Sequence, residues 1–338
     1  MRRPRSVLAI VAALVAAGMV AGVWLAASRQ ASPTAGPDPA APGSPVVARV
    51  PIDGKPRQLA LAPGGLWVVS DHHLYRIDTA TNRVVASLPV GTRAADPGGL
   101  AVSADATWVP GQRSDLLWRV DRAARRISGR VRLGQVLYGP VGVAVRGEDV
   151  WVSCCGLQYG PRPAGMLLRV DGRRNRVAGR TPIPEGPLAL VAGQEAVWVG
   201  TARGSLLRVD PATGRVVARV PPPDPRSRIQ ALSPGPGVLW VADTGAGAIR
   251  RFDLAAGRFT LAVTAPLPRN LAAGPDGAWV VTDLNQLLSR VDARTGQRGA
   301  PIPLNDLGGV RGIAVAPDAV WVTTGNQVVR VDPARHPR

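Results

Sequence analysis

The sequence has little cysteine, histidine or lysine, and each shortage excludes a class of protein. Two Cys in 338 residues exclude a disulfide-stabilised scaffold. The three His form no zinc-spaced set, and there is no Gly-x-Ser-x-Gly elbow or phosphate loop, so no recognisable catalytic motif is present. Lys55 is the only lysine beside 40 Arg, a split typical of GC-rich coding, so arginine abundance alone does not indicate function.

Aromatic residues are also scarce, whereas residues that interrupt helices are abundant. Aromatics make up 4% of the chain, and nine of them are Trp. The 39 Gly and 33 Pro argue against a large helical bundle. The apolar content of 46% is too high for a wholly disordered chain. The composition therefore favours a turn-rich all-β protein.

The N-terminal residues predict a membrane anchor. Residues 1–5 form a basic tip with three Arg, and residues 7–27 carry no charge. A helix over 6–27 would be roughly 32 Å long, enough to span a bilayer core. The preceding positive charges place the N-terminus in the cytoplasm and the rest of the chain outside it. The alternative is a cleaved signal peptide, which would make the protein secreted. Residues 28–45, rich in Ala, Pro and Gly, are expected to form a flexible linker.

Seven internal repeats follow the linker. Each contains a Trp-Val pair, and the pairs recur at intervals of 39–47 residues. The Trp residues are Trp67, Trp108, Trp151, Trp198, Trp240, Trp279 and Trp321. An Arg-x-Asp sequence follows each pair, ending at Asp78, Asp121, Asp171, Asp210, Asp253, Asp292 and Asp332. The spacing predicts four short strands per repeat, with the Trp on the second strand and the Asp ending the third.

Between the third and fourth strands we expect a tight turn with positive φ four residues after the Asp, at Asn82, Asn175, Gly214, Gly257 and Gly296; Arg125 departs from this pattern.

The two ends of the repeat region complement each other. The seventh repeat stops after its third strand, and residues 46–50 have the pattern of a fourth strand. Residues 46–338 are therefore predicted to form a seven-bladed β-propeller of four-stranded blades, closed by the N-terminal strand.

These repeats resemble those of the YVTN and NHL-type β-propellers. The segment 321–326 (WVTTGN) is similar to the YVTN motif with Trp for Tyr, and 241–245 (VADTG) is similar to the NHL version. The resemblance implies the fold, and fold-level relatives include virginiamycin B lyases and lactonase-type propellers. It says little about chemistry, because propellers carry many functions.

Four arginines are the candidate anion-binding residues. Each lies where an inner strand is expected to begin and is followed by a Pro six residues later. They are Arg57, Arg228, Arg269 and Arg311. They belong to the first, fifth, sixth and seventh blades, which are consecutive in a closed ring. A positive arc at one channel mouth would suit a carboxylate or a phosphate. The alternative is four solvated arginines in an arginine-rich chain.

Three acids and two cysteines are further candidates. Asp71, Asp243 and Asp283 follow their Trp by three or four residues, where they would either hold Ca²⁺ or Mg²⁺ or cap their own turns. Cys154 and Cys155 are adjacent in the longest loop and would form a strained vicinal disulfide or remain thiols. A lyase-like mechanism would need a His base such as His72, with no matching Glu evident.

The fourth strands carry much of the remaining charge. Their arginines are Arg49, Arg83, Arg130, Arg180, Arg219 and Arg258. Charges on outermost strands block edge-to-edge pairing. A basic rim would also suit anionic lipid or a cell-envelope polymer.

The sequence favours a binding module over an enzyme. We expect a monomeric, membrane-tethered extracytoplasmic propeller that binds an anionic small molecule, an envelope polymer or a protein at its channel face, without nucleic acid and without a required cofactor. The alternatives are a metal-dependent lyase or lactonase-like enzyme, and an envelope scaffold that uses its basic rim.

Overall fold

The computed structural model describes residues 38–39, 43–90, 99–111, 114–124, 126–134, 140–154, 165–282, 286–304 and 309–335. These residues belong to one unit, Pro33–Arg338. No helix within the described ranges is long and apolar enough to cross a membrane. The expected anchor over 6–27 lies outside those ranges and stays a prediction.

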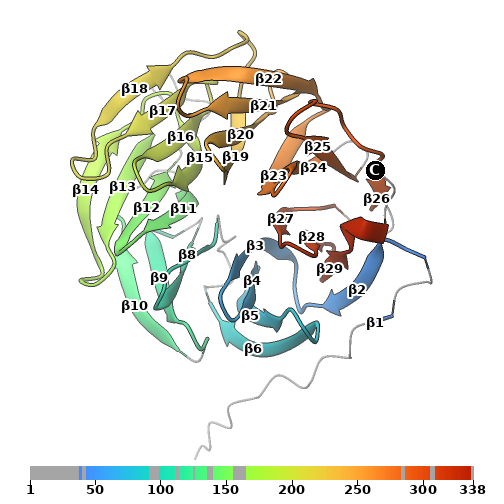
Figure 1. Cartoon of the computed structure of the whole chain (residues 1–338). Helices are drawn as coiled ribbons and strands as arrows, with labels where there is room; N and C mark the ends of the chain where they lie inside the picture. The colour runs from blue at the N-terminus through green and yellow to red at the C-terminus, as the bar shows by residue number, and fades with distance from the viewer. Residues whose placement is uncertain are drawn as a thin grey trace, which may run out of the picture. The chain divides into compact units, whose positions relative to one another are not determined.

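Seven antiparallel sheets form a ring, as the repeats predict (Figure 1). We number the blades from the first Trp repeat. Blades 1 to 3 contain β3 (Pro56–Ala62), β4 (Gly65–Ser70), β5 (His73–Asp78) and β6 (Arg83–Pro89); β7 (Ala101–Val102), β8 (Ala106–Pro110), β9 (Leu116–Asp121) and β10 (Ile127–Arg132); β11 (Pro140–Arg146), β12 (Asp149–Cys154), β13 (Met166–Asp171) and β14 (Arg176–Pro182).

Blades 4 to 6 continue the same order from the inner to the outer strand. They contain β15 (Pro187–Ala192), β16 (Val197–Thr201), β17 (Leu206–Val209) and β18 (Val216–Val220); β19 (Ile229–Gly235), β20 (Val238–Asp243), β21 (Ala248–Asp253) and β22 (Arg258–Thr264); β23 (Pro268–Gly274), β24 (Gly277–Thr282), β25 (Leu287–Asp292) and β26 (Ile302–Pro303).

Blade 7 joins the two ends of the ring. It contains β27 (Gly312–Val315), β28 (Val320–Thr324) and β29 (Gln327–Val331), and its fourth strand is β2 (Val46–Pro51), which pairs with β29. The predicted closure by the N-terminal strand is therefore confirmed. Within the stretch expected to be a flexible linker, β1 (Asp38–Pro39) adds a fifth strand against the free edge of β2. That edge offers unpaired backbone groups, which a short extended segment can satisfy. The linker over 28–45 stays a prediction.

Each repeated Trp packs into the gap before the next blade. Trp151 of β12 is fully buried in a cluster with Val197 and Val199 of blade 4, and Trp321 of β28 packs with Leu66 and Val68 of blade 1. All seven repeated Trp are at most 8% exposed. Because blades splay apart with distance from the ring axis, a large ring fills the widening wedge, and hydrophobic burial thus holds the ring together.

The turns between third and fourth strands adopt the backbone that their residues predict. Asn82, Asn175, Gly214 and Gly257 have φ of 56°, 50°, 72° and 63°. In blade 2 the left-handed residue is Ala124, with φ of 54°, so this turn places it one position earlier than the repeat predicts.

In blades 1, 3, 4, 5 and 6 the Asp of the Arg-x-Asp sequence caps this turn. Asp292 accepts hydrogen bonds from the backbone N–H groups of Thr295 and Arg294 at 2.7 and 2.9 Å, and Asp78 and Asp253 hold their turns in the same way. These hydrogen bonds favour the charged carboxylate and lower the pKa of Asp292. These acids therefore act in structure.

The Arg of the same sequence joins neighbouring blades. Arg330 lies over the ring of Trp321, with its guanidinium 5.7 Å from the centroid, and donates to Asp318 at 2.7 Å. Arg169 donates to the carbonyl of Ala212, in the turn of the next blade, at 2.8 Å. Arginines at this position thus cover a Trp or tie one blade to the next.

Candidate functional site

The predicted arginines lie where inner strands begin, and three of them share one structural position. In blades 1 and 6 the pairing of the inner strand with the second strand skips one residue, Arg57 between Pro56 and Gln58, and Arg269 between Pro268 and Asn270. A residue at such a bulge is released from the ladder. Arg311 precedes Gly312 in blade 7 at the same distance from the Trp-paired residue.

The fourth arginine has a different position. In blade 5 the skipped residue is Gln230, between Ile229 and Ala231, and Arg228 lies two residues earlier. The reason is that the Pro six residues after Arg228 does not occupy the same place in its blade as the corresponding Pro of the other three blades. The repeated Trp gives the correct register: Arg57, Arg269 and Arg311 each precede their Trp by ten residues, as Gln230 does. This spacing was available in the sequence and would have excluded Arg228 from the arc.

Hydrogen bonds connect these three positions across the blades. The side chain of Asn270 donates to the carbonyl of Arg311 at 2.6 Å, which joins blades 6 and 7. The Thr323 hydroxyl donates to the carbonyl of Arg57 at 3.4 Å, which joins blades 7 and 1. The backbones of the three arginines are therefore neighbours at one edge of the ring. We call Arg57, Arg269 and Arg311 the arginine arc.

The members of the arc differ in exposure. Arg269 and Arg311 are exposed, whereas Arg57 is half-buried and forms an ion pair with Asp71, with Nε and Oδ1 2.7 Å apart. The ion pair holds Arg57 in place and offsets part of its charge. Arg269 and Arg311 are consequently the members of the arc that a ligand in solution reaches most easily.

Blade 1 also carries a cluster of polar side chains around Tyr75. Tyr75 donates its hydroxyl to the carbonyl of Asp53 at 3.0 Å and stacks at a tilt on His73, 5.7 Å between centroids. Burial lowers the pKa of His73, and burial together with the nearby Asp53 carboxylate raises the pKa of Tyr75 to about 12. Both groups are therefore neutral near pH 7. His72, the candidate base, precedes His73 in the chain.

The predicted metal ligands are engaged by the protein where they are described. Asp243 is fully buried, and its oxygens accept from Ser227, Arg250 and the backbone N–H of Arg228 at 2.7–2.9 Å. Asp71 pairs with Arg57, and Asp283 lies outside the described residues. Within the described ranges no three His, Cys, Asp or Glu side chains come together as a metal site would need. The metal stays a prediction.

The cysteine pair is only half described. Cys154 ends β12 and is 2% exposed, packed with Val150 and Leu168. Cys155 lies outside the described residues. The vicinal disulfide is therefore untested and stays a prediction.

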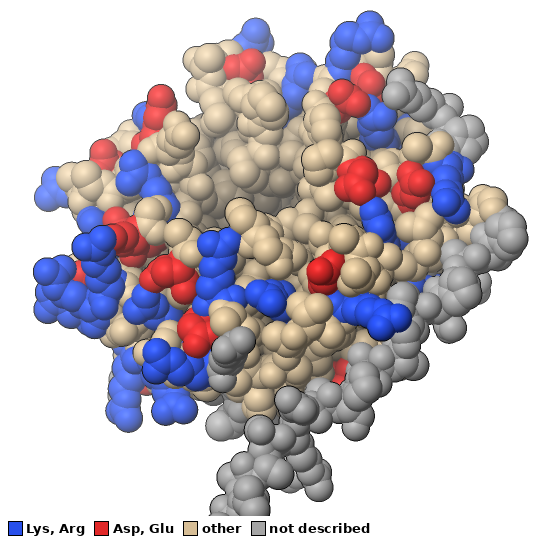
Figure 2. All heavy atoms as spheres, turned by 60° about the horizontal axis from the view of Figure 1, so that its bottom comes forward, with Lys and Arg blue, Asp and Glu red and all other residues tan. Residues whose placement is uncertain are grey.

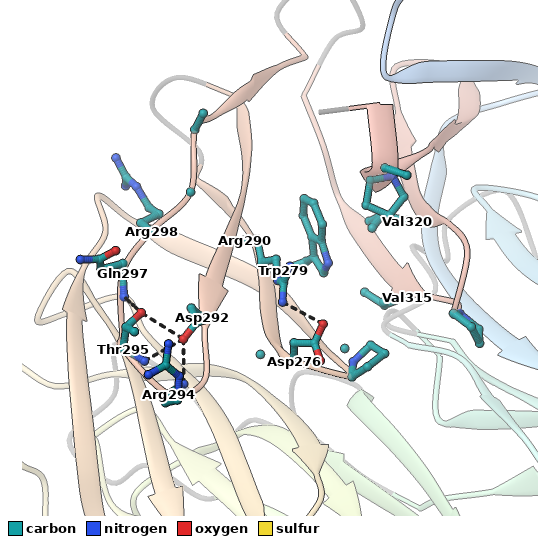
Figure 3. A pocket seen from close by; sticks show the side chains of 18 of the residues that line it. Asp276, Trp279, Arg290, Asp292, Arg294, Thr295, Gln297, Arg298, Val315 and Val320 are labelled. Atoms are coloured by element: carbon teal, nitrogen blue, oxygen red, sulfur yellow. Dashed lines mark hydrogen bonds and ion pairs between the residues drawn. The ribbon is translucent and has the colours of Figure 1, made fainter. Parts of the chain in front are cut away.

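A cleft of about 840 Å³ opens between blades 6 and 7, at the opposite edge of the sheets from the arc (Figure 3). It exists because β26 has two residues, whereas the other outer strands have five to seven. Before β26 the chain pairs with β25 only through an isolated bridge between Arg298 and Val291. Trp279, Val315 and Val320 line its inner wall. Its central charges neutralise each other, since Arg290 donates to Asp276 at 3.0 Å (Figure 3). Nothing in the sequence predicted this cleft.

Solved structures share this fold at low sequence identity. The chain is similar to the WD40 domain of Neurospora crassa Pan2, at 14% identity and a TM-score of 0.65, covering 83% of this chain and 90% of that one. It is also similar to the β-propeller domain of Myceliophteria thermophila Cps50 (Swd1), at 14% identity and a TM-score of 0.68, covering 83% and 96%. No family model and no curated protein matches the chain. The similarity establishes the β-propeller fold alone.

Proposed function

We propose that the protein is a binding module whose arginine arc captures an anionic group at one mouth of the channel. The observation that carries this proposal is the repetition of Arg three residues before the Trp-paired residue of the inner strand on three consecutive blades, 6, 7 and 1. The other described bulges carry Val141, Leu188 and Gln230. Positive charge is thus collected at one side of the mouth.

The geometry suits capture by a rigid site. The adjoining ladder fixes the backbone at each of the three positions, and the hydrogen bonds through Asn270 and Thr323 fix these positions to each other. Little ordering is then needed on binding, which lowers its entropic cost. Guanidinium groups bind carboxylates and phosphates with paired N–H donors. An acidic peptide segment or an anionic small molecule is the ligand class that this chemistry fits.

The wider setting belongs to the same proposal. The charge-free run over 7–27 supports a membrane tether, with the propeller outside the cytoplasm. The repeats and the fold support a place among YVTN- or NHL-type propellers. The two fold-level neighbours include a WD40 domain, and propellers of that architecture are consistent with a role in protein interaction.

Titration of the full chain with inorganic phosphate, citrate and a Glu-rich peptide tests the proposal. Arg269→Ala/Arg311→Ala is expected to weaken binding at least tenfold, because it removes both exposed members of the arc. The matched control is Arg83→Ala/Arg258→Ala, which removes two exposed arginines from outer strands and should leave binding unchanged. Equal weakening in both variants, or no binding by the parent chain, would contradict the arc as the site.

The same experiment should also test whether the protein binds Ca²⁺ or Mg²⁺. If Asp71, Asp243 and Asp283 hold Ca²⁺ or Mg²⁺, either ion will raise the melting temperature of the parent protein and not of Asp71→Asn. A shift of this kind would favour the lyase or lactonase alternative and direct the work to turnover assays.

A further inference from the structure

The positive charge of the propeller is concentrated on three of its seven blades. Blades 2 to 4, residues 99–220, contain 18 Arg and nine acidic residues, a net charge of +9. The rest of the region from 46 to the C-terminus carries +6. Coding bias would enrich arginine evenly, so this difference between blades needs another explanation.

Apart from Arg203, in the turn between β16 and β17, the described exposed arginines of this group lie on outer strands and on the turns that lead into them. We call them the basic flank: Arg126, Arg130, Arg132, Arg173, Arg174, Arg176, Arg180, Arg215 and Arg219. Figure 2 shows dense Lys and Arg atoms at the left, the side on which Figure 1 places β10, β14 and β18.

The flank repeats one spacing on each of its three blades. Arginines lie four residues apart at 126 and 130, at 176 and 180, and at 215 and 219. Along a strand this separation is about 13 Å. The first member of each pair lies at the strand start, and the second lies opposite Trp118, Leu168 or Leu207 of the third strand. At the second position blades 1 and 5 have Ser87 and Ala262 instead.

The first members of the three pairs form one row along the rim, and the second members form a second row. Interactions with the preceding blade hold two arginines of the second row in place. Arg180 of blade 3 donates to the carbonyl of Leu133 in blade 2 at 2.8 Å. Arg219 of blade 4 forms an ion pair with Glu185, in the connection that leaves blade 3. Each side chain thus reaches back to the preceding blade, so these contacts link blade 4 to blade 3 and blade 3 to blade 2.

Other members of the flank carry charge that the protein does not offset. Among the residues that the structure describes, Arg130, Arg176 and Arg215 have no carboxylate within ion-pair distance, whereas Arg173 and Arg174 pair with Glu148 and Asp171. Edge protection alone needs a single charge on a strand. Two rows on three adjacent blades exceed that need.

We propose that the basic flank binds a linear anionic glycopolymer, one that carries phosphate or uronate groups at regular intervals. Two rows of guanidinium groups along a curved rim match a flexible chain of negative charges. A flat lipid surface would meet only part of a flank that turns through three blades. Single-stranded nucleic acid is disfavoured because the exposed large hydrophobic residues in the described ranges include no aromatic for base stacking.

Salt-dependent binding of the full chain tests this proposal, with poly(glycerol phosphate) and polygalacturonate as probes. Removal of one arginine that binds a phosphate should reduce the slope of log K against log salt by about 0.7. Arg130→Ala/Arg176→Ala/Arg215→Ala, one change per blade, should therefore reduce it by about 2. The same positions changed to Lys should retain most of the slope, because charge is kept.

The control removes the same charge from the other blades. Arg83→Ala/Arg258→Ala/Arg294→Ala changes three exposed arginines of blades 1, 5 and 6 and should leave the slope unchanged. The proposal is wrong if both triple variants weaken binding equally, if neither polymer binds, or if oligothymidylate or phosphatidylglycerol vesicles bind more tightly than both polymers. The arc variant Arg269→Ala/Arg311→Ala should bind these polymers normally, which separates this proposal from the first.

Discussion

Two of the repeated Trp residues should differ in their contribution to stability, although the sequence makes them equivalent. Trp151 is fully buried in the closed wedge between blades 3 and 4. Trp279 packs in the wedge between blades 6 and 7, where its ring also lines the open cleft (Figure 3). Substitution of each by Ala compares a closed site with an open one.

The expected size of the effect follows from the area that the ring buries. A buried Trp side chain removes roughly 150–250 Å² from water, or about 4–6 kcal/mol at 25 cal/mol per Å². Ala retains part of this, so Trp151→Ala should lower the free energy of unfolding by about 3–5 kcal/mol, including the cost of an enclosed cavity. In Trp279→Ala the vacated space joins a solvent-filled cleft, and the reduction should be about 1–2 kcal/mol smaller.

Urea unfolding followed by circular dichroism measures both reductions on the same scale. The dependence of the unfolding free energy on urea should keep its slope in both variants, so that midpoints can be compared. Trp67→Ala is a second closed-site control, since Trp67 is 1% exposed. If Trp279→Ala is destabilised as much as the other two variants, or more, then the open cleft does not relieve the cavity and the expected difference is wrong.

Three further predictions concern backbone strain and pH. Gly257 has φ of 63°, and no atom lies within 4 Å of the place a Cβ would occupy, so Gly257→Ala should cost about 1–2 kcal/mol in urea unfolding from backbone strain alone, and Gly257→Asn less. The N–H of Thr295 lowers the pKa of Asp292 below its usual 3.8; this stabilisation is complete above pH 3.8 and is lost as pH falls through the lower folded value. Acid titration of stability should accordingly be flatter for Asp292→Asn, and an unchanged profile would contradict this. Burial raises the pKa of Tyr75 to about 12, so its contribution is complete below pH 10 and is lost as pH rises to about 12; Tyr75→Phe should remove this step from the alkaline stability curve.

The arginine arc illustrates how far the sequence could specify the candidate site. Counting from Pro predicted four members, and the structure places three of them at the same distance from the Trp-paired residue and Arg228 elsewhere. The Pro marks a turn whose length varies between blades. The Trp is fixed by packing between blades, so counting from it gives the register.

The architecture of this protein follows from its repeats. Regular spacing of Trp and Arg-x-Asp predicted seven four-stranded blades, and the incomplete seventh repeat predicted closure by residues 46–50, because each blade can bury its apolar faces only against its neighbours. The left-handed turns at Asn82 and Gly257 also followed from residue type.

Which residues from different repeats meet depends on the folded ring. The ion pair of Arg57 with Asp71, the four donors around Asp243, and the cleft beside Trp279 all depend on side-chain directions and on how far each outer strand extends. A repeat pattern describes what the blades have in common. The short β26 and the concentration of arginine on blades 2 to 4 are differences between blades. Only the closed ring shows where these features lie relative to each other.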